Sequence, residues 1–420
     1  MIDSPNINLD EYAISENGFL PSSLPLAMLT NNYYEPWENI AQHLPALLQS
    51  GHIRSMVDKL PLLTTENLRT EPEWRRAYSI LGFITHAYIW GGQLPEDSLP
   101  TCLSKPFIEI SNHLGLPPCA TYAGLALWNY TTAADTDITD PDNVSTLTSF
   151  TGTSDEEWFI VISVAIEAKG GKLLQLMLDA IAAATAKDTE LLTGLLCKFT
   201  DRLQDFNNTL KRLNDRCNPK VFFYQLRPLL AGSKNMSIAG LPNGVFYNEG
   251  NGVGEWRQYS GGSNGQSSLI QTFDLFLGVV HSATGGRSSP TEYLVDMRNY
   301  MPGPHRNFLE TFADISNVRS YVMSESSEAE PSTLKEAYSA ACLMLAEFRT
   351  THMQIVTRYI VVPANRGRPK EGSETVNLAT ASAQIEGLNE DGASGLYGTG
   401  GTSLIPFLRQ TRDTTKDAAR

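Results

Sequence analysis

The most constraining feature of this sequence is a long stretch near its C-terminal end that contains no residue able to stop a helix. Thr333 and Glu336 form a capping-box pattern, and the next helix breaker is Pro363. Apolar residues and one histidine recur within it at spacings of three and four, on one helix face: Leu345, Phe348, His352, Ile355 and Tyr359. We therefore expect the longest helix of the chain here, with one face buried in a helical core.

The rest of the chain has the same helical periodicity and predicts an all-α fold. Apolar residues recur at helical spacing from Tyr34 to about Tyr130, so residues 1–130 are expected to form a small helical domain. Residues 131–153 are rich in Thr, Asp, Ser and Gly, and this composition is typical of a linker. Residues 154–420 are then expected to form a large helical domain.

Helix-breaking residues and polar stretches divide the large domain into separate helices and loops. A capping box at Ser154 opens a helix that we expect to end at Gly170-Gly171, and a second helix follows from Lys172 to about Ala186. Residues 231–268 are rich in Gly, Ser and Asn, and loops of this length are more often functional than idle. Residues 364–402 are Gly-rich and are expected to be mobile. Strand-like alternation is too sparse to predict a sheet.

The charge balance favours a small-molecule ligand. The sequence has 32 Lys and Arg against 46 Asp and Glu, a formal net charge of −14, which argues against nucleic acid or a membrane surface as a partner. The N-terminus is polar, and the longest apolar run, around Trp158 to Ile166, is too short to span a bilayer. The five cysteines are scattered without a CxxC pair, as expected in a reducing compartment. We expect a cytoplasmic protein.

His352 is the residue most able to carry chemistry, because it lies on the buried face of the long helix. One interpretation is a core histidine bonded to a backbone carbonyl, and the other is an axial ligand of a haem iron. The seven histidines include no HExxH pair, and no Ser/His/Asp pattern is present. The Gly-rich segments 250–254 and 261–265 lack the preceding strand and the following Lys of a phosphate-binding loop, which argues against a nucleotide site.

Several long motifs resemble one known family. They are VFFYQLR (221–227), GGSNGQSS (261–268), QTFDLFLG (271–278), DMRNYMPGPHRNFL (296–309), RTTHMQIVTRYI (349–360) and GTGGT (398–402). Two further motifs, LGLPPCATYAGLALWN and ENGFLP, extend the resemblance into the small domain. In order and spacing they are similar to the indoleamine 2,3-dioxygenases, and the resemblance covers almost the whole chain.

The resemblance implies a fold and an activity. It implies one haem b per chain between helices of the large domain, which the small domain caps. The implied oxidoreductase inserts both atoms of O2 into the indole 2,3-bond of L-tryptophan and releases N-formylkynurenine. This reaction is the first step of tryptophan catabolism by the kynurenine route toward NAD biosynthesis. An electron donor would keep the iron ferrous, and we expect a monomer.

The resemblance also implies which residues hold the haem. His352 matches the family's proximal histidine, and the opposite face of the iron is left open for O2. Arg349 and Asp274 match a pair near the haem edge that would help to hold a propionate. The alternative for these two residues is an ion pair that holds no ligand.

Phe222, Phe223 and Arg227 match the family's substrate-binding set. If this segment is α-helical, Phe223 and Arg227 lie four residues apart on one face, which places an aromatic wall beside a guanidinium. The ring would pack on the indole, and Arg227 would bind the substrate carboxylate by a bidentate hydrogen bond. Without the family match, core phenylalanines and a surface arginine would be the simpler interpretation.

The other positions that match the family's pocket are Tyr122, Ser163, Gly262, Ser263, Asn264 and Thr399. We expect Ser163 to form a hydrogen bond, commonly to the carbonyl four residues before it, and no side chain is assigned as a general acid or base. Thr399 lies in the Gly-rich segment, which we expect to close as a lid. Asn264 departs from the small apolar residue expected at its position, and it bears on pocket volume and on the contact to the substrate's amino group.

Three other interpretations stay open. A non-enzymatic haem protein of the same fold could carry oxygen, although Phe223 and Arg227 argue against this. A low-affinity paralogue could act on another indole, in which case Asn264 would matter. A helical scaffold without a cofactor is the third, and His352 on the buried helix face argues against it.

Overall fold

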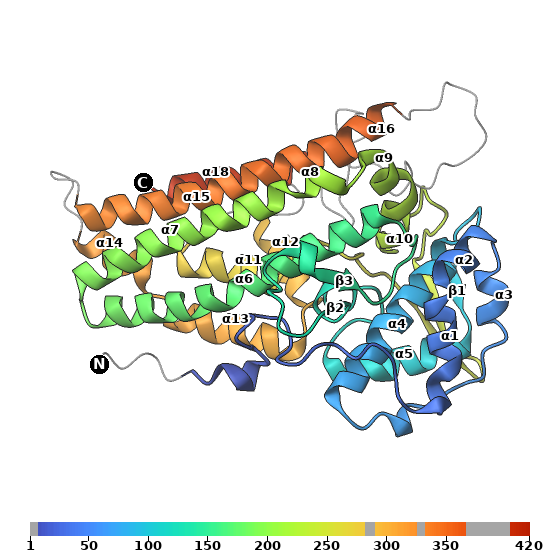
Figure 1. Ribbon diagram of the computed structural model, residues 1–420. Coiled ribbons are helices and arrows are strands. Elements are labelled where there is room, and N and C mark those ends of the chain that lie inside the picture. The colour runs from blue at the N-terminus through green and yellow to red at the C-terminus, as the bar shows by residue number, and fades with distance from the viewer. Residues whose placement is uncertain (1–6, 282–289, 326–331, 367–403) are drawn as a thin grey trace.

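The computed structural model describes residues 7–281, 290–325, 332–366 and 404–420, and the expected helical fold is confirmed (Figure 1). The N-terminal group of helices comprises α1 (Glu35–Gln42), α2 (Leu44–Gln49), α3 (Ile53–Val57), α4 (Glu71–Trp90) and α5 (Thr101–Leu114). The second group is built on α6 (Ser154–Thr185), α7 (Thr189–Lys211), α15 (Thr333–Val356) and α18 (Leu404–Ala418). No helix in the described ranges is long and apolar enough to cross a membrane.

The long helices form a frame that the shorter elements complete. Helix α7 packs against α6 and α15, and α18 lies along α15 (Figure 1). The shorter helices are α8 (Leu213–Arg216), α9 (Pro219–Val221), α10 (Arg227–Leu230), α11 (Ser268–Phe276), α12 (Pro290–Arg298), α13 (Gly303–Ile315), α14 (Val318–Glu325) and α16 (Val362–Arg366). One continuous apolar core extends through both groups, from Ile14 to Ala418. The division into two domains therefore stays a prediction.

The segment expected to be a linker has a structure of its own. Strand β2 (Tyr130–Thr132) pairs in antiparallel fashion with β3 (Val144–Thr146). The turn between the strands is held by Arg212, whose guanidinium lies 2.9 Å from Asp140 and 2.5 Å from Asp142. Composition alone could not reveal this pair of strands, because acidic turn residues are also typical of linkers. The arginine that binds them lies far away in the sequence.

A second small sheet contradicts the expectation that none would form. Strand β4 (Val245–Gly250) pairs antiparallel with β5 (Val253–Arg257) and parallel with β1 (Ser98–Leu99). Val245 and Tyr247 are buried, whereas Phe246 between them is half-buried. The alternation of side chains that is typical of a strand is therefore present, but it extends over very few residues. The polar, Gly-rich composition of residues 231–268 concealed it.

Helix α6 passes through Gly170-Gly171, where the sequence predicted an end. A Cβ atom at Gly170 would lie 2.6 Å from the Leu269 side chain, and one at Gly171 would lie 1.9 Å from the carbonyl oxygen of Glu16. The two glycines therefore allow the N-terminal segment and Leu269 to pack closely against the helix. A glycine pair ends a helix only where no tertiary contact requires its small size.

We expect Gly171→Ala to destabilise the protein, because the new methyl group would meet backbone atoms that cannot move independently. Overpacking of this kind costs roughly 1–3 kcal/mol, and this contact should lie at the upper end. Gly194→Ala in α7 is the matched control, since a Cβ atom added there would have no other atom within 4 Å, and it should stabilise by about 0.5–1 kcal/mol. Urea unfolding of both variants checks the prediction, which fails if the two shift stability in the same direction.

The helical path that begins at Thr333 continues past Pro363. Ser332 caps α15, its hydroxyl accepting from the amide of Lys335 at 3.2 Å. A π turn, η8 (Thr357–Val361), then leads into α16. Pro363 occupies the second position of α16, directly after the π turn. Because of this turn α15 has 24 residues, fewer than the 32 of α6, so the expectation of the longest helix here was wrong.

Candidate functional site

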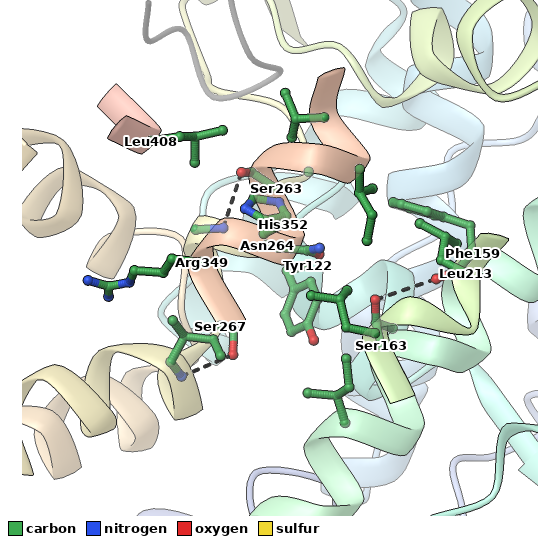
Figure 2. A pocket seen from close by; sticks show the side chains of 18 of the residues that line it. Tyr122, Phe159, Ser163, Leu213, Ser263, Asn264, Ser267, Arg349, His352 and Leu408 are labelled. Atoms are coloured by element: carbon green, nitrogen blue, oxygen red, sulfur yellow. Dashed lines mark hydrogen bonds between the residues drawn. The ribbon is translucent and has the colours of Figure 1, made fainter. Parts of the chain in front are cut away.

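A large cavity lies within the second group of helices (Figure 2). The cavity has a volume of about 250 Å³, and its mouth is open to solvent. Side chains from α6, α11, α15 and α18 line it, together with the loop before α11, and most of them are apolar. An enclosed, mainly apolar space with a few polar groups is the usual form of a small-molecule site.

Three π turns contribute to the walls of this cavity. They are η4 (Ala123–Leu127), η6 (Phe222–Leu226) and η8, and they supply Leu125, Phe222 and Ile360 respectively. In a π turn the hydrogen bond joins residues five apart, so the side chains that share a face differ from those in an α-helix. Such turns are frequent at functional sites.

His352 lines the cavity from α15, on the face that the sequence predicted (Figure 2). Its ring is half-buried, and within the described ranges neither ring nitrogen has a hydrogen-bond partner. Burial, and then the nearby charge of Arg349, lower the pKa of His352 from 6.5 to about 4. The imidazole is therefore neutral at physiological pH and keeps a nitrogen lone pair for a ligand in the cavity.

Arg349 and Asp274 form an ion pair in the cavity wall. Nη2 of Arg349 lies 2.7 Å from both carboxylate oxygens of Asp274, and Nη1 donates to the carbonyl of Thr411 at 3.0 Å. His281, which the sequence did not single out, lies 3.1 Å from Asp274 through Nε2. Burial acts to raise the pKa of Asp274, but Arg349 and His281 together hold it below its ordinary value. The carboxylate is therefore ionised, and this part of the wall is rigid and polar.

Arg227 is fully buried and lines the cavity, as Phe222 does. Burial lowers the pKa of its guanidinium to about 10, which leaves it protonated at neutral pH. Phe222 and Arg227 share the cavity wall because they lie five residues apart across the π turn. A buried cation and an aromatic ring therefore both belong to the wall of the cavity.

Phe223 lies beside Arg227, as the four-residue spacing predicted, but it is not among the side chains that line the cavity. It is fully buried against Ala364 and Ile360. Its ring centre lies 5.8 Å from Cζ of Arg227, so it supports the guanidinium from behind. The expected pairing of Phe223 with Arg227 is therefore present, whereas Phe222 is the aromatic residue of this segment that lines the cavity. A contact between Phe223 and the substrate stays a prediction.

Tyr122 and Ser163 both line the cavity (Figure 2). The Ser163 hydroxyl lies 3.5 Å from the carbonyl oxygen of Phe159, four residues before it, as the sequence predicted, and this is a long hydrogen bond. The Tyr122 hydroxyl donates to Glu167 at 2.9 Å. Glu167 also lines the cavity, is 1% exposed and accepts a second hydrogen bond from Ser267 at 2.6 Å.

Sequence reasoning missed Glu167, although a signal was present. It is the first charged residue after Glu157 in the otherwise apolar run of α6, and it lies one turn after Ser163. Burial raises its pKa from 4.5 to about 7, although the hydrogen bonds from Ser267 and Tyr122 act to lower it. A carboxyl group that is half-protonated at neutral pH inside a cavity is a candidate functional group.

We expect Glu167→Gln to stabilise the protein increasingly as pH rises. A folded-state pKa above the unfolded value means that the group contributes stability below about pH 4.5, and that this is lost as pH rises through about 7. One pKa unit corresponds to about 1.4 kcal/mol, so the difference between variant and parent should grow by about 3 kcal/mol over this range. Urea unfolding at pH 5 and pH 8 measures it, and an unchanged difference would contradict the shift.

The loop before α11 brings three predicted residues to the cavity: Gly262, Ser263 and Asn264 (Figure 2). A Cβ atom at Gly262 would lie 2.4 Å from Leu125, so the loop lies directly on the π turn η4. The Ser263 hydroxyl accepts from the amide of Gly265 at 3.2 Å and fixes the loop. The predicted lid residue Thr399 lies outside the described residues.

Helix α18 lines the cavity with residues that the sequence did not single out. Leu404, Leu408 and Thr411 contribute to the wall. Their spacing of four and three is the signal that could have identified this helix. Threonines at buried positions made its apolar face inconspicuous.

The residues present fit a haem group. A neutral imidazole is a common axial ligand of haem iron, and His352 presents one to the cavity with no competing protein partner in the described part of the chain. Apolar side chains of α15 and α18 offer surfaces for a macrocycle. Arg349 provides a cation in the same wall for an acidic substituent.

Comparison with known proteins gives a family for the whole chain. The model of the indoleamine 2,3-dioxygenase family matches residues 8–418. An indoleamine 2,3-dioxygenase of Aspergillus nanangensis is 40% identical over 426 residues, which cover 100% of this chain and 98% of the relative. The indoleamine 2,3-dioxygenase of Saccharomyces cerevisiae is 41% identical, over 97% of this chain and 92% of its own length.

A third relative carries a different name. The 6-hydroxytryptophan 2,3-dioxygenase of Fusarium equiseti is 40% identical over 415 residues, which cover 98% of each chain. These matches extend over both groups of helices and include every residue that lines the cavity. The chain therefore belongs to the indoleamine 2,3-dioxygenase family, whose members are haem-dependent dioxygenases of indoles.

Proposed function

We propose that this protein cleaves the indole 2,3-bond of L-tryptophan with both atoms of O2 and releases N-formylkynurenine, using haem b held by His352. The observation that carries the proposal is the neutral imidazole of His352, which faces a large apolar cavity without a protein partner in the described ranges. When bound, the haem supplies the iron at which O2 is activated. The contributions of the protein are binding, orientation and exclusion of water.

Arg349 and Asp274 would stabilise the haem at its polar edge. The bidentate contact to Asp274 fixes the guanidinium on one side, and the Thr411 carbonyl and Thr415 hydroxyl of α18 accept from it on the other. The guanidinium is thereby oriented before any ligand arrives. A propionate would meet a preorganised cation, which costs less conformational entropy than ordering a free arginine.

Arg227 would bind the carboxylate of the substrate. It is a buried cation, and a charge-assisted hydrogen bond in such surroundings is stronger than one in water. Phe222 lies in the same wall and would pack against the indole ring. Together they would hold and orient the indole within the cavity that would also hold the haem.

No side chain needs to be a general acid or base in this proposal. The Ser163 proton is directed at the carbonyl of Phe159, and the Tyr122 proton at Glu167. The indole N–H can therefore keep its proton while the apolar walls exclude water. We further propose a monomer in the cytoplasm that works with a separate electron donor, as the first step from tryptophan toward NAD.

A second candidate function is the same reaction on another indole. Asn264 places an amide in the cavity wall where a small apolar residue was expected. The name of the Fusarium equiseti relative indicates that a protein of this family acts on a ring-hydroxylated tryptophan. An amide can bind a hydroxyl group on the substrate ring, whereas an apolar side chain cannot.

The test is a time course of the haem-loaded protein, reduced with ascorbate in air, with L-tryptophan and with 6-hydroxytryptophan in parallel. The product is followed by near-ultraviolet absorbance and by its mass, which should exceed that of the substrate by two oxygen atoms. Faster turnover of L-tryptophan supports the first proposal, and faster turnover of the hydroxylated substrate supports the second. A haem spectrum without product from either would refute both.

A further inference from the structure

Helix α4 belongs to the N-terminal group of helices, yet two of its side chains bond to the backbone beside the cavity. Nδ1 of His86 lies 2.9 Å from the carbonyl oxygen of Leu229. Nε1 of Trp90 donates to the carbonyl of Ala231, also at 2.9 Å. His86 and Trp90 are buried and lie one turn apart on α4, on the side that meets α10, the short helix that carries Arg227.

Helix α10 has only four residues and cannot fix its own position. The last carbonyl groups of a helix have no partner within the helix, and other donors must satisfy them when they are buried. The carbonyls of Leu229 and of Ala231, which directly follows the helix, are in this position, and α4 supplies a donor for each. Arg227 lies two residues before Leu229, so its place in the cavity wall depends on this attachment.

The other ring nitrogen of His86 bonds to a second segment of the cavity wall. Nε2 accepts from the backbone amide of Ala120 at 3.0 Å, two residues before Tyr122, which lines the cavity. Because the amide only donates and the Leu229 carbonyl only accepts, the ring carries its proton on Nδ1. Burial lowers the pKa of His86 from 6.5 to about 4, in agreement with this neutral form.

We propose that His86 and Trp90 are positioning residues that fix Arg227 in the cavity wall and thereby set the affinity of the site for the substrate carboxylate. This inference rests on the role proposed above for Arg227. Neither His86 nor Trp90 lines the cavity, so their effect on the substrate must pass through the backbone that they hold. An indole without a carboxylate does not use Arg227, so the effect is confined to substrates that carry one.

The first test requires neither haem nor activity. Hydrogen exchange of the full chain, followed by mass spectrometry, should be faster around both Ala120 and Leu229 in His86→Ala. Trp90→Phe keeps an aromatic ring but loses the donor, and it should accelerate exchange around Leu229 alone. Tyr88→Phe is the matched control, because it removes a hydrogen bond that the same helix makes elsewhere. Unchanged exchange around Leu229 in both variants would overturn the proposal.

Two conservative variants separate the two hydrogen bonds of His86. Asparagine places an amide nitrogen near the position of Nδ1, so His86→Asn should retain the bond to Leu229. Glutamine places an amide oxygen near the position of Nε2, so His86→Gln should retain only the bond to Ala120. In the haem-loaded protein, His86→Gln should raise the KM for L-tryptophan about 10-fold or more, since a misplacement of about 1 Å can cost about 100-fold. His86→Asn should stay close to the parent.

Tryptamine, an indole without the carboxylate, shows whether the effect passes through Arg227. Its kcat/KM should be nearly equal in the parent, His86→Gln and Trp90→Phe, and the kcat for L-tryptophan should change little. Equal losses for the two substrates, or equal losses in His86→Asn and His86→Gln, would refute the proposal, because both results indicate general destabilisation. If the parent converts neither substrate, the proposed function fails, and the exchange measurement still decides whether α4 holds the segment that carries Arg227.

Discussion

The His352→Ala variant is expected to be purified without haem and without a Soret band, although it folds. The imidazole would be the protein's single bond to the iron, and even loss of a residue that only supports a ligand lowers metal affinity about 10–100-fold. We therefore expect haem affinity to fall by at least about 100-fold. Haem titration followed by absorbance measures this, with circular dichroism as the measure of folding.

Two controls make this result specific to coordination. Gln354→Ala changes an exposed residue of the same helix and should bind haem normally. Added imidazole should restore a six-coordinate or five-coordinate haem spectrum in His352→Ala, because the substitution leaves space where the ring was. Normal haem content in His352→Ala would disprove the assignment of the axial ligand.

Arg227→Ala should bind haem but raise the KM for L-tryptophan strongly. Removing one partner of a buried, charge-assisted hydrogen bond costs about 2–5 kcal/mol, and each 1.4 kcal/mol corresponds to about tenfold. The KM should therefore rise by about 30-fold or more. Arg227→Lys should show an intermediate value, because it keeps the charge but loses the bidentate geometry.

Tryptamine is the matched substrate control, since it has the indole ring but no carboxylate. If Arg227 binds the carboxylate, the ratio of kcat/KM between parent and Arg227→Ala should be large for L-tryptophan and close to one for tryptamine. Equal losses for both substrates would mean that Arg227 shapes the cavity rather than binding the carboxylate. An unchanged KM for L-tryptophan would exclude either role.

The sequence predicted the elements whose signal is local. The periodicity around His352 placed that residue correctly on a buried helix face, and the four-residue spacing predicted the contact of Ser163 with Phe159. Both depend only on the regular geometry of an α-helix. Most of the cavity-lining residues named from the family resemblance are likewise brought together.

The features that the sequence did not reveal depend on distant contacts. Gly171 does not end α6, because the backbone at Glu16 packs on it. His281 reaches Asp274 only because the end of α11 turns back toward α18. Phe223 was assigned to the cavity because the π turn could not be recognised from residue preferences. Each of these is decided by tertiary packing rather than by local preference.

Because of the π turns, the shape of this cavity depends on how many residues each of these turns contains. A π turn can be regarded as an α-helical turn with one residue inserted, and removing that residue would rotate everything that follows by about 100°. A single deletion within Phe222–Leu226 would thus turn Arg227 out of the wall, whereas a substitution there would alter one contact. Insertions and deletions in these short segments, more than point substitutions, are the changes by which such a cavity could acquire a different ligand.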